Sequence, residues 1–234
     1  MDGSIVVTGS HDTTVMVWEV TSSTRIVNKK VRDAQNIPYR IRKDHILLDK
    51  PCHILCGHND VFTYVAVCME LDLLVSGSKY SSCILHTLWH GMYVRSIYHP
   101  NGSALSKMVV SRNGRLVLYS NDDLNLLLYS INGKLLATSE TNGRINCMEL
   151  SSCGEFLVCS GDKGQIILRS MHSLEIVSRY DAMGKVILSL SVTSEDCFLV
   201  GTQDGSLLVY SLETPQQRKS SLLQNIKSRT FATG

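Results

Sequence analysis

One segment of this sequence has the residue types that could hold a metal ion. Residues 52–58 read Cys-His-Ile-Leu-Cys-Gly-His and supply two thiols and two imidazoles, which are ligands that zinc prefers. On one extended strand, however, Cys52 and Cys56 lie about 13 Å apart at about 3.3 Å per residue, too far for one tetrahedral ion with Zn–S bonds of about 2.3 Å. We therefore interpret the segment as an outer strand followed by a structural histidine, and we predict no metal site and no cofactor.

Two other features could take part in acid–base catalysis. His86 could act as a general base, and Asp122-Asp123 could act as a pair of carboxyl groups. The sequence shows no glycine-rich phosphate loop, no nucleophile elbow with a Ser/His/Asp set, and no spaced carboxylate pair to accompany them. His86 also occupies a recurring structural position, and Asp122-Asp123 is typical of a turn. We predict no catalytic residues and no enzyme activity.

Basic residues are concentrated in two segments. Residues 21–51 hold eight Lys and Arg and three acidic residues, and residues 214–234 hold four basic residues and no acid. Such clusters can bind acidic lipid headgroups or RNA phosphates, although Tyr39 is the single aromatic residue available for base stacking in the first segment. A solvated loop, an acidic membrane surface and a protein partner remain alternatives, and nucleic acid is disfavoured. The candidate anion-binding residues are Lys29, Lys30, Arg32, Arg40, Arg42 and Lys43.

The elements that position all these residues come from an internal repeat. Residues 6–20, 74–88, 118–131, 158–171 and 199–212 each contain an apolar run, a polar turn and a second apolar run. The second runs contain the anchor residues Trp18, His86, Tyr129, Arg169 and Tyr210, and the last three intervals between anchors are 43, 40 and 41 residues. This period is typical of a WD-repeat β-propeller. The first interval is 68 residues, and an insertion at 21–51 within one blade explains the excess.

The turns of the repeat favour short acceptor side chains. Asp12, Asp123 and Asp204 lie where a carboxylate can accept hydrogen bonds from the amides of its own turn. His58 follows Gly57 just before an expected strand at 61–67, at the Gly-His position of WD repeats. Further strands are expected at 73–76, 82–88 and 92–97.

In WD repeats that histidine, a turn Asp, a strand Ser or Thr and a Trp form one hydrogen-bonded chain. The second repeat has Tyr80 in place of the Asp and His86 in place of the Trp, and the fourth has Lys163 and Arg169. We therefore predict a degenerate propeller that is held mainly by strand pairing and packing.

Composition places the chain among ordinary globular proteins. Of its 234 residues, 44% are hydrophobic and 19% are charged, so a sizeable core can form. No apolar run approaches 18 residues, and the first residues lack the basic and apolar regions of a signal peptide. Its eight cysteines are expected to be reduced thiols. We predict a cytoplasmic location, with peripheral association with endomembranes as an option.

Residues 54–88, ILCGHNDVFTYVAVCMELDLLVSGSKYSSCILHTL, resemble the WD-repeat region that follows the BEACH domain in neurobeachin-like proteins. Those proteins have His-Thr where other propellers have Trp-Asp, as at His86-Thr87. Further matches are YSINGKLLATSE (129–140) and GTQDGSLLVYSLE (201–213), and the plant Spirrig-type branch is resembled most closely through 104–134 and 142–165. The resemblance covers about nine-tenths of the chain. It departs at Tyr80, where the family usually has Asp.

The resemblance implies a noncatalytic protein–protein interaction module of a large scaffold in vesicle and membrane trafficking, with the adjoining BEACH domain as a partner. The expected fold is all-β, an incomplete WD-repeat propeller of about four full blades and a partial first blade. Residues 1–20 would form the partial blade, 21–51 the basic insertion loop, 52–213 four blades, and 214–234 a flexible basic tail. Partners would bind the loops between strands, through Asn59, Asp60, Lys79, Tyr80, Asn121, Asp122 and Gln203.

Two alternative functions are carried forward. The chain could be an accessory that binds acidic lipid or RNA through residues 25–43. It could also be a truncated fragment without independent function, because unpaired sheet edges invite aggregation.

Overall fold

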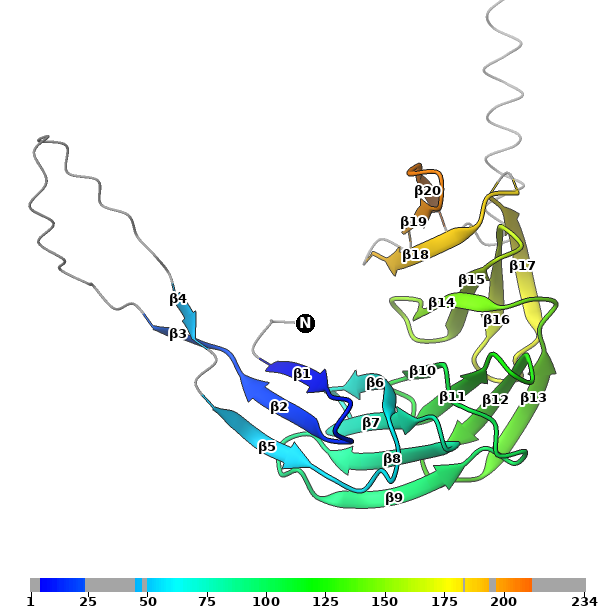
Figure 1. The fold of residues 1–234 in the computed structure, drawn as a ribbon. Helices are drawn as coiled ribbons and strands as arrows, with labels where there is room; N and C mark the ends of the chain where they lie inside the picture. The colour runs from blue at the N-terminus through cyan, green and yellow to red at the C-terminus, as the bar shows by residue number, and fades with distance from the viewer. Residues whose placement is uncertain (1–4, 24–44, 48–49, 183, 194–196, 212–234) are drawn as a thin grey trace, which may run out of the picture. The chain divides into compact units, whose positions relative to one another are not determined.

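The computed structural model describes residues 5–23, 45–47, 50–182, 184–193 and 197–211 (Figure 1). Every regular element in these ranges is a β-strand, and neighbouring strands within each sheet pair in antiparallel fashion. Apolar runs rich in Val, Ile, Leu and Tyr alternate with short polar turns, a pattern that favours paired strands. In the same ranges no helix is long and apolar enough to cross a membrane. The predicted all-β repeat fold is confirmed.

The first of two compact units comprises residues 1–106 and contains two sheets of the repeat. The first sheet has three strands, β1 (Ile5–Gly9), β2 (Val15–Glu19) and β5 (Pro51–Leu55). The second has four strands, β6 (Phe62–Cys68), β7 (Leu73–Ser78), β8 (Ser82–Thr87) and β9 (Tyr93–Tyr98). The strands of the second sheet lie where the sequence predicts them, to within two residues at each end.

The predicted insertion loop at 21–51 separates β2 from β5 in the sequence, and both strands belong to the first sheet. β2 pairs directly with β5, with Val15 opposite Leu55 and Met16 opposite Ile54. Within this segment two short strands, β3 (Thr21–Ser23) and β4 (His45–Leu47), pair with each other. Residues 24–44, which contain the candidate anion-binding side chains, lie outside the described residues.

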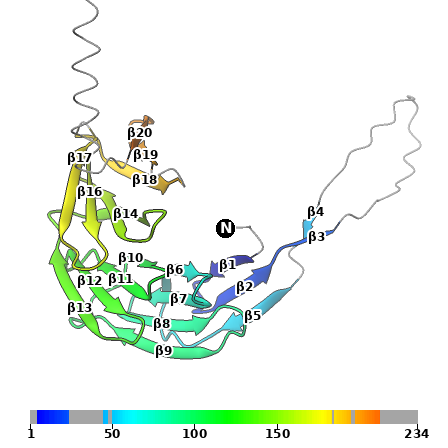
Figure 2. The same ribbon diagram turned by 180° about the vertical axis from the view of Figure 1, so that it is seen from behind.

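The second unit comprises residues 107–234 and contains three sheets (Figures 1 and 2). Its first sheet is formed by β10 (Lys107–Val110), β11 (Arg115–Ser120), β12 (Asn125–Ser130) and β13 (Leu135–Glu140). The next is formed by β14 (Ile145–Leu150), β15 (Phe156–Gly161), β16 (Gln165–Ser170) and β17 (Ile176–Asp181). The last contains β18 (Ile187–Val192), β19 (Cys197–Thr202) and β20 (Leu207–Ser211). Over 52–213 the described residues therefore form three four-stranded sheets and one three-stranded sheet, together with β5 of the first sheet.

Middle strands are buried and outer strands are not. All six residues of β7 are buried, and β11 is buried from Leu116 to Ser120, whereas β13 and β17 alternate between exposed and half-buried positions. Each unit has apolar clusters built from several sheets' inward faces, including one around Leu74 and Leu88 in the first unit and two in the second. Because burial of a large apolar side chain contributes about 1.5–3 kcal/mol, these clusters are the main source of stability.

The turn between β15 and β16 requires glycine at its last position. Gly164 has a φ of +65°, and a Cβ there would lie 2.6 Å from the carbonyl oxygen of Lys185 and 2.8 Å from the carbonyl carbon of Gly184. An L-residue is disfavoured at such a φ, and here it would also meet backbone on one side. Gly164 therefore provides the backbone conformation with which this turn ends.

Candidate functional site

The five anchor residues occupy equivalent places in the five repeat sheets. Each lies opposite an apolar residue of the preceding strand: Trp18 opposite Val6, His86 opposite Leu74, Tyr129 opposite Leu116, Arg169 opposite Leu157 and Tyr210 opposite Phe198. In the first four sheets the register toward the outermost strand shifts at the anchor itself. Such an irregularity changes the direction of a side chain and increases the local twist of the strand. The sequence gives no signal for these register shifts.

His58 connects three segments of the second sheet. Its Nε2 lies 2.8 Å from the hydroxyl of Ser76 on β7, and its Nδ1 lies 3.0 Å from the hydroxyl of Ser82 at the start of β8. Ser82 in turn lies 2.7 Å from the hydroxyl of Ser78. His58 and Ser76 occupy the histidine and strand-serine positions of the repeat, and Tyr80 occupies the position of the turn Asp. Ser82, two residues further on, supplies the polar partner instead.

The same network is electrostatically neutral. Burial lowers the pKa of His58, and the nearby His86 imidazole lowers this pKa further. Burial alone lowers the pKa of His86, which is 4% exposed and packs edge-on against Tyr93. Nδ1 of His86 is buried and makes no hydrogen bond within the described part of the chain. The geometry suits a structural pair of imidazoles.

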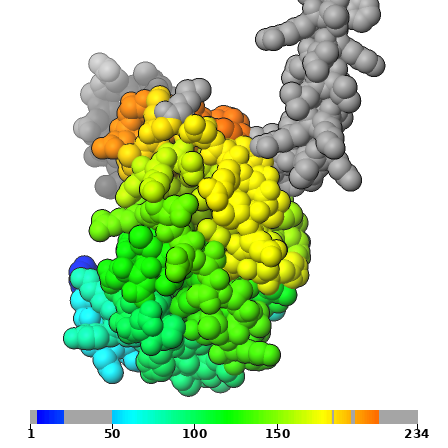
Figure 3. Space-filling view, turned by 90° about the vertical axis from the view of Figure 1, so that its right-hand side faces the viewer, coloured from blue at the N-terminus to red at the C-terminus, as the bar shows by residue number. Residues whose placement is uncertain are grey.

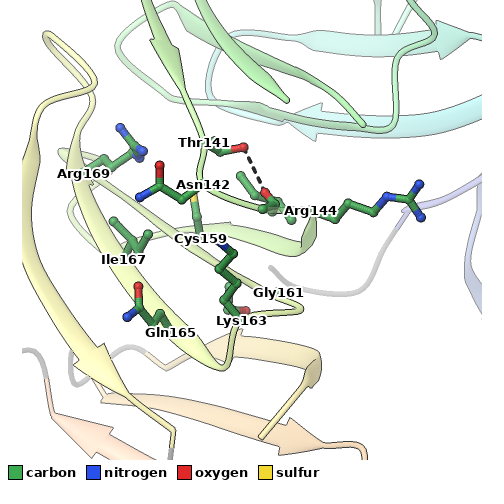
Figure 4. A pocket seen from close by; sticks show the side chains of 12 residues that line it. Thr141, Asn142, Arg144, Cys159, Gly161, Lys163, Gln165, Ile167 and Arg169 are labelled. Atoms are coloured by element: carbon green, nitrogen blue, oxygen red, sulfur yellow. Dashed lines mark hydrogen bonds between the residues drawn. The ribbon is translucent and has the colours of Figure 1, made fainter. Parts of the chain in front are cut away.

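The fourth sheet has a hollow in the equivalent place (Figure 4). Residues 141–145, the turn at 161–165 and two β16 side chains, Ile167 and Arg169, enclose a cavity of about 40 Å³. Cys159 lies opposite Ile167 as Ser76 lies opposite Ile84, so Cys159 corresponds in register to Ser76. Asn142 is exposed. The side chain of Ser160 belongs to the other face of β15, and its buried hydroxyl makes no hydrogen bond within the described residues.

Arg169 brings a buried positive charge to this cavity. It is 3% exposed and its Nη1 donates to the hydroxyl of Ser139 at 2.7 Å and to the carbonyl of Leu174 at 2.8 Å, while its Nε is buried without an acceptor. Among the described residues no carboxylate lies within ion-pair distance of this guanidinium. Burial raises the pKa of the adjacent Cys159 thiol to about 12, so this thiol stays uncharged. An uncompensated buried charge is costly, and hydrogen bonds to neutral oxygens of Ser139, Leu174 and Glu140 offset part of this cost.

Tyr119 holds the loop that forms one wall of the cavity. This fully buried residue of β11 accepts a hydrogen bond from the backbone N–H of Ile145 at 3.0 Å, and its hydroxyl lies 3.5 Å from the carbonyl oxygen of Gly143. The sequence analysis did not identify Tyr119 or Ser160.

Replacement of Tyr119 by phenylalanine is expected to lower the free energy of unfolding by about 1–2 kcal/mol, because it leaves the buried N–H of Ile145 without an acceptor. Urea unfolding followed by circular dichroism measures this change. Tyr98, which is 64% exposed, provides the control, and Tyr98→Phe should change the unfolding free energy by less than about 0.5 kcal/mol. Equal effects of the two replacements would contradict the role assigned to Tyr119.

The turn carboxylates behave in two ways. Asp12 accepts hydrogen bonds from the backbone N–H and hydroxyl of Thr14, which hold the pKa of Asp12 below its usual range. Asp204 accepts from the amide of Ser206 and from Lys185 Nζ at 2.6 Å, and these partners, Lys185 first, strongly lower its pKa. Asp123 lies half-buried in the equivalent turn of the third sheet.

The loops proposed for partner binding are largely accessible. Asn59, Lys79, Asp122 and Gln203 are exposed, and Tyr80 is 70% exposed. The remaining two candidates, Asp60 and Asn121, are half-buried.

Large apolar side chains are also exposed on outer strands, which the sequence analysis did not single out. Just before β9 and at its first two residues, Trp89, Met92, Tyr93 and Val94 have exposures from 42% to 63%. In the second unit, Leu135 and Leu136 of β13 and Ile176 and Val177 of β17 are 39–43% exposed. Figure 3 shows the surface that β17 (yellow) and β13 (green) contribute. Contiguous apolar residues at a surface mark interaction sites.

Within the described residues no group of three or more His, Cys, Asp and Glu side chains could hold a metal ion. Cys52 and Cys56 are both exposed and free, and the buried thiols Cys68 and Cys83 have raised pKa values because of burial. Each of the eight cysteines is free.

Comparison with known proteins decides the family. Residues 1–220 match the Neurobeachin beta propeller domain. The chain belongs to this neurobeachin propeller family. It is 57% identical over 97% of its length to BEACH domain-containing protein B of Arabidopsis thaliana, and 28% identical over 89% of its length to BEACH domain-containing protein lvsE of Dictyostelium discoideum. The neurobeachin-type propeller chain spans only 9% of the length of either relative. The resemblance to BEACH-domain proteins is therefore confirmed.

Solved structures show the same fold. The WD40 β-propeller domain of Doa1 aligns with a TM-score of 0.65 at 18% identity, over 91% of this chain and 62% of that one. The computationally designed Ika8 protein aligns with the same TM-score and identity, over 57% of its own chain. The neurobeachin-type sheets are thus WD40 propeller blades, a type of module that binds proteins.

Proposed function

We propose that this chain is a noncatalytic protein-interaction module of a BEACH-domain scaffold that acts in vesicle or membrane trafficking. The observation that carries the proposal is the exposed apolar group around β9, which we call the β9 patch: Trp89, Met92, Tyr93 and Val94. Trp and Tyr are enriched among the residues that dominate binding energy at protein interfaces.

The β9 patch lies on a well-packed sheet. β9 pairs along its length with β8, whose residues Cys83–His86 are buried. A patch presented on such a sheet loses little conformational entropy when a partner binds. The exposed loop residues Lys79, Tyr80 and Gln203 extend the available surface. Proteins, including the adjoining BEACH domain of the parent chain, are the proposed partners, in a cytoplasmic setting with peripheral contact to endomembranes.

The proposal is tested in the full parent protein. Met92→Ser with Tyr93→Ser removes two apolar side chains from the β9 patch, and Thr138→Ser on the exposed side of β13 is the control. Affinity purification with quantitative mass spectrometry, joined to uptake of an endocytic tracer, compares the three forms. We expect the double variant to lose specific protein partners and to slow tracer transport, while the control keeps both. Unchanged partners and transport in the double variant would refute the proposal.

The basic segment at 21–51 supports a second candidate, binding of acidic lipid or RNA. Phosphatidylserine vesicles and single-stranded RNA are the probes. Binding that is strong at low salt and disappears at physiological salt would favour this candidate, since counterion release dominates such contacts. Absence of binding at low salt would exclude it.

A further inference from the structure

We propose that the free face of the last sheet docks another WD-type sheet, supplied by the parent protein from outside these 234 residues. This face, here called the β20 face, is formed by alternate residues of the three strands: Ser189, Ser191, Leu199, Gly201, Leu207 and Val209. The inference rests on the proposed function in one respect, namely that the chain is part of a longer BEACH-domain protein.

Strand register places the residues of the β20 face on one side of the last sheet. Gly201 lies opposite Leu207, and Leu199 lies opposite Val209. Residues two apart on a strand point to the same side of a sheet. The other side, which includes Phe198, packs against the fourth sheet (Figure 1). One side of the last sheet is therefore covered by protein and the other is not.

Exposure distinguishes the β20 face from the same face of the two preceding sheets. Leu207 and Val209, three residues and one residue before the anchor Tyr210, are 68% and 65% exposed. The residues at the same distances before the two preceding anchors are 0–6% exposed: Ile166 and Leu168 in the fourth sheet, and Leu126 and Leu128 in the third. Because the position in the repeat is the same, the difference comes from what covers each face.

A following sheet covers this face wherever it is buried in the second unit. Leu126 of the third sheet packs in one apolar cluster with Leu157 of the fourth, and Ile166 of the fourth packs in another with Phe198 of the last. Both covering residues lie on the second strand of the following sheet. β20 is the last described strand, so the described chain holds no following sheet for the β20 face. The partner that fits is a sheet whose second strand presents a large apolar side chain.

The composition of the β20 face favours the same kind of partner. None of its six residues is acidic or basic, and its two most exposed apolar side chains are those of a leucine and a valine. Charged residues normally occupy surface that faces water, and an exposed apolar surface marks an interaction site. Two sheets pack face to face about 10 Å apart through such side chains, and here no charge of the β20 face would lose its water.

The length of chain outside these residues favours the parent protein as the source of the partner sheet. The chain spans 9% of two BEACH-domain relatives, and it aligns with 62% of a WD40 propeller. The rest of that propeller has no counterpart in this chain. Propellers arrange their sheets around a central channel, so each sheet has a neighbour on both faces. A sheet in the same polypeptide is also present at a high effective concentration.

Site-specific photo-cross-linking in the full parent protein tests the proposal. A diazirine analogue of leucine replaces Leu207, and the same analogue at Leu135, which is 43% exposed on β13, is the matched control. An equal amount of ¹⁵N-labelled parent protein reveals links between copies, and mass spectrometry locates each link. We expect position 207 to link to one WD-repeat segment outside these 234 residues, and position 135 not to link to that segment. Links from position 207 to the BEACH domain, to a second copy, to a separate protein, to these 234 residues or to no peptide would overturn the proposal.

Limited proteolysis gives a second readout that does not require the analogue. Val209→Ser removes an apolar side chain from the β20 face, and Thr138→Ser on exposed β13 is the control. In the parent protein Val209→Ser should speed cleavage of the propeller about tenfold, because it weakens a packed contact there, whereas the 234-residue chain should be cleaved at an unchanged rate. Equal effects in the two forms contradict the docked sheet. Loss of partners from the β9 patch variant changes neither readout, so failures of the two proposals are distinguishable.

Discussion

Replacement of Gly161 by alanine is expected to lower the free energy of unfolding by about 3 kcal/mol. A Cβ at this position would lie 2.9 Å from the carbonyl carbon of Arg144, closer still to its oxygen, and 3.1 Å from the backbone nitrogen of Asn146. These atoms belong to the backbone at the start of β14, where the register against β15 shifts between Ile145 and Cys147. Because β14 is paired along β15, this backbone cannot move away cheaply.

Gly143 is the matched control, because it lies in the same pocket. A Cβ there would meet only the side chain of Lys163, at 3.2 Å and beyond, and that exposed side chain can move. Gly143→Ala should change the unfolding free energy by less than about 0.5 kcal/mol. Urea unfolding followed by circular dichroism measures both, and amide exchange in β14–β16 locates the effect. Similar stability of the two variants would show that the close approach at Gly161 is not structurally required.

Lowering the pH from 7.5 to 5.5 is expected to reduce the stability of the first unit by up to about 2 kcal/mol through His58 and His86. Burial lowers the pKa of both imidazoles below the ordinary value of 6.5. Above that value both the folded and the unfolded chain are neutral at these groups, so the full stability is present. Below it the unfolded chain takes up protons first, and stability falls until the pH reaches the folded pKa values.

Tryptophan fluorescence during urea unfolding measures this dependence, because both tryptophans of the chain, Trp18 and Trp89, belong to the first unit. His58→Gln cannot take up a proton and should reduce the slope of stability against pH between 6.5 and 5.5 by about half. His90→Gln, at an exposed histidine, is the control and should leave the slope unchanged. A slope that His58→Gln does not alter would exclude His58 as its source.

The sequence by itself determined the all-β class, the repeat period, the strand positions of the second sheet and the family. These follow from local signals, since apolar alternation and turn residues act over a few neighbouring positions. The sequence also places His58 and Ser76 at two positions of the recurring pattern. Only the tertiary structure showed that Ser82, and not Tyr80, is the second hydrogen-bond partner of His58. Ser82 is the first residue of β8, and the position of its hydroxyl depends on where that strand starts, which the sequence motif does not specify.

The cavity beside Arg169 could not be predicted for a related reason. The sequence identifies Lys163 and Arg169 as substitutions in a repeat, but it does not show that Arg169 is buried without a carboxylate or that Ser160 lacks a partner. Those facts depend on which residues surround a side chain in space, including Ser139 and Leu174 from segments on either side. Local sequence patterns determine the strands and their order. Whether a charged side chain such as Arg169 is buried without a counter-charge depends on segments that only folding brings together.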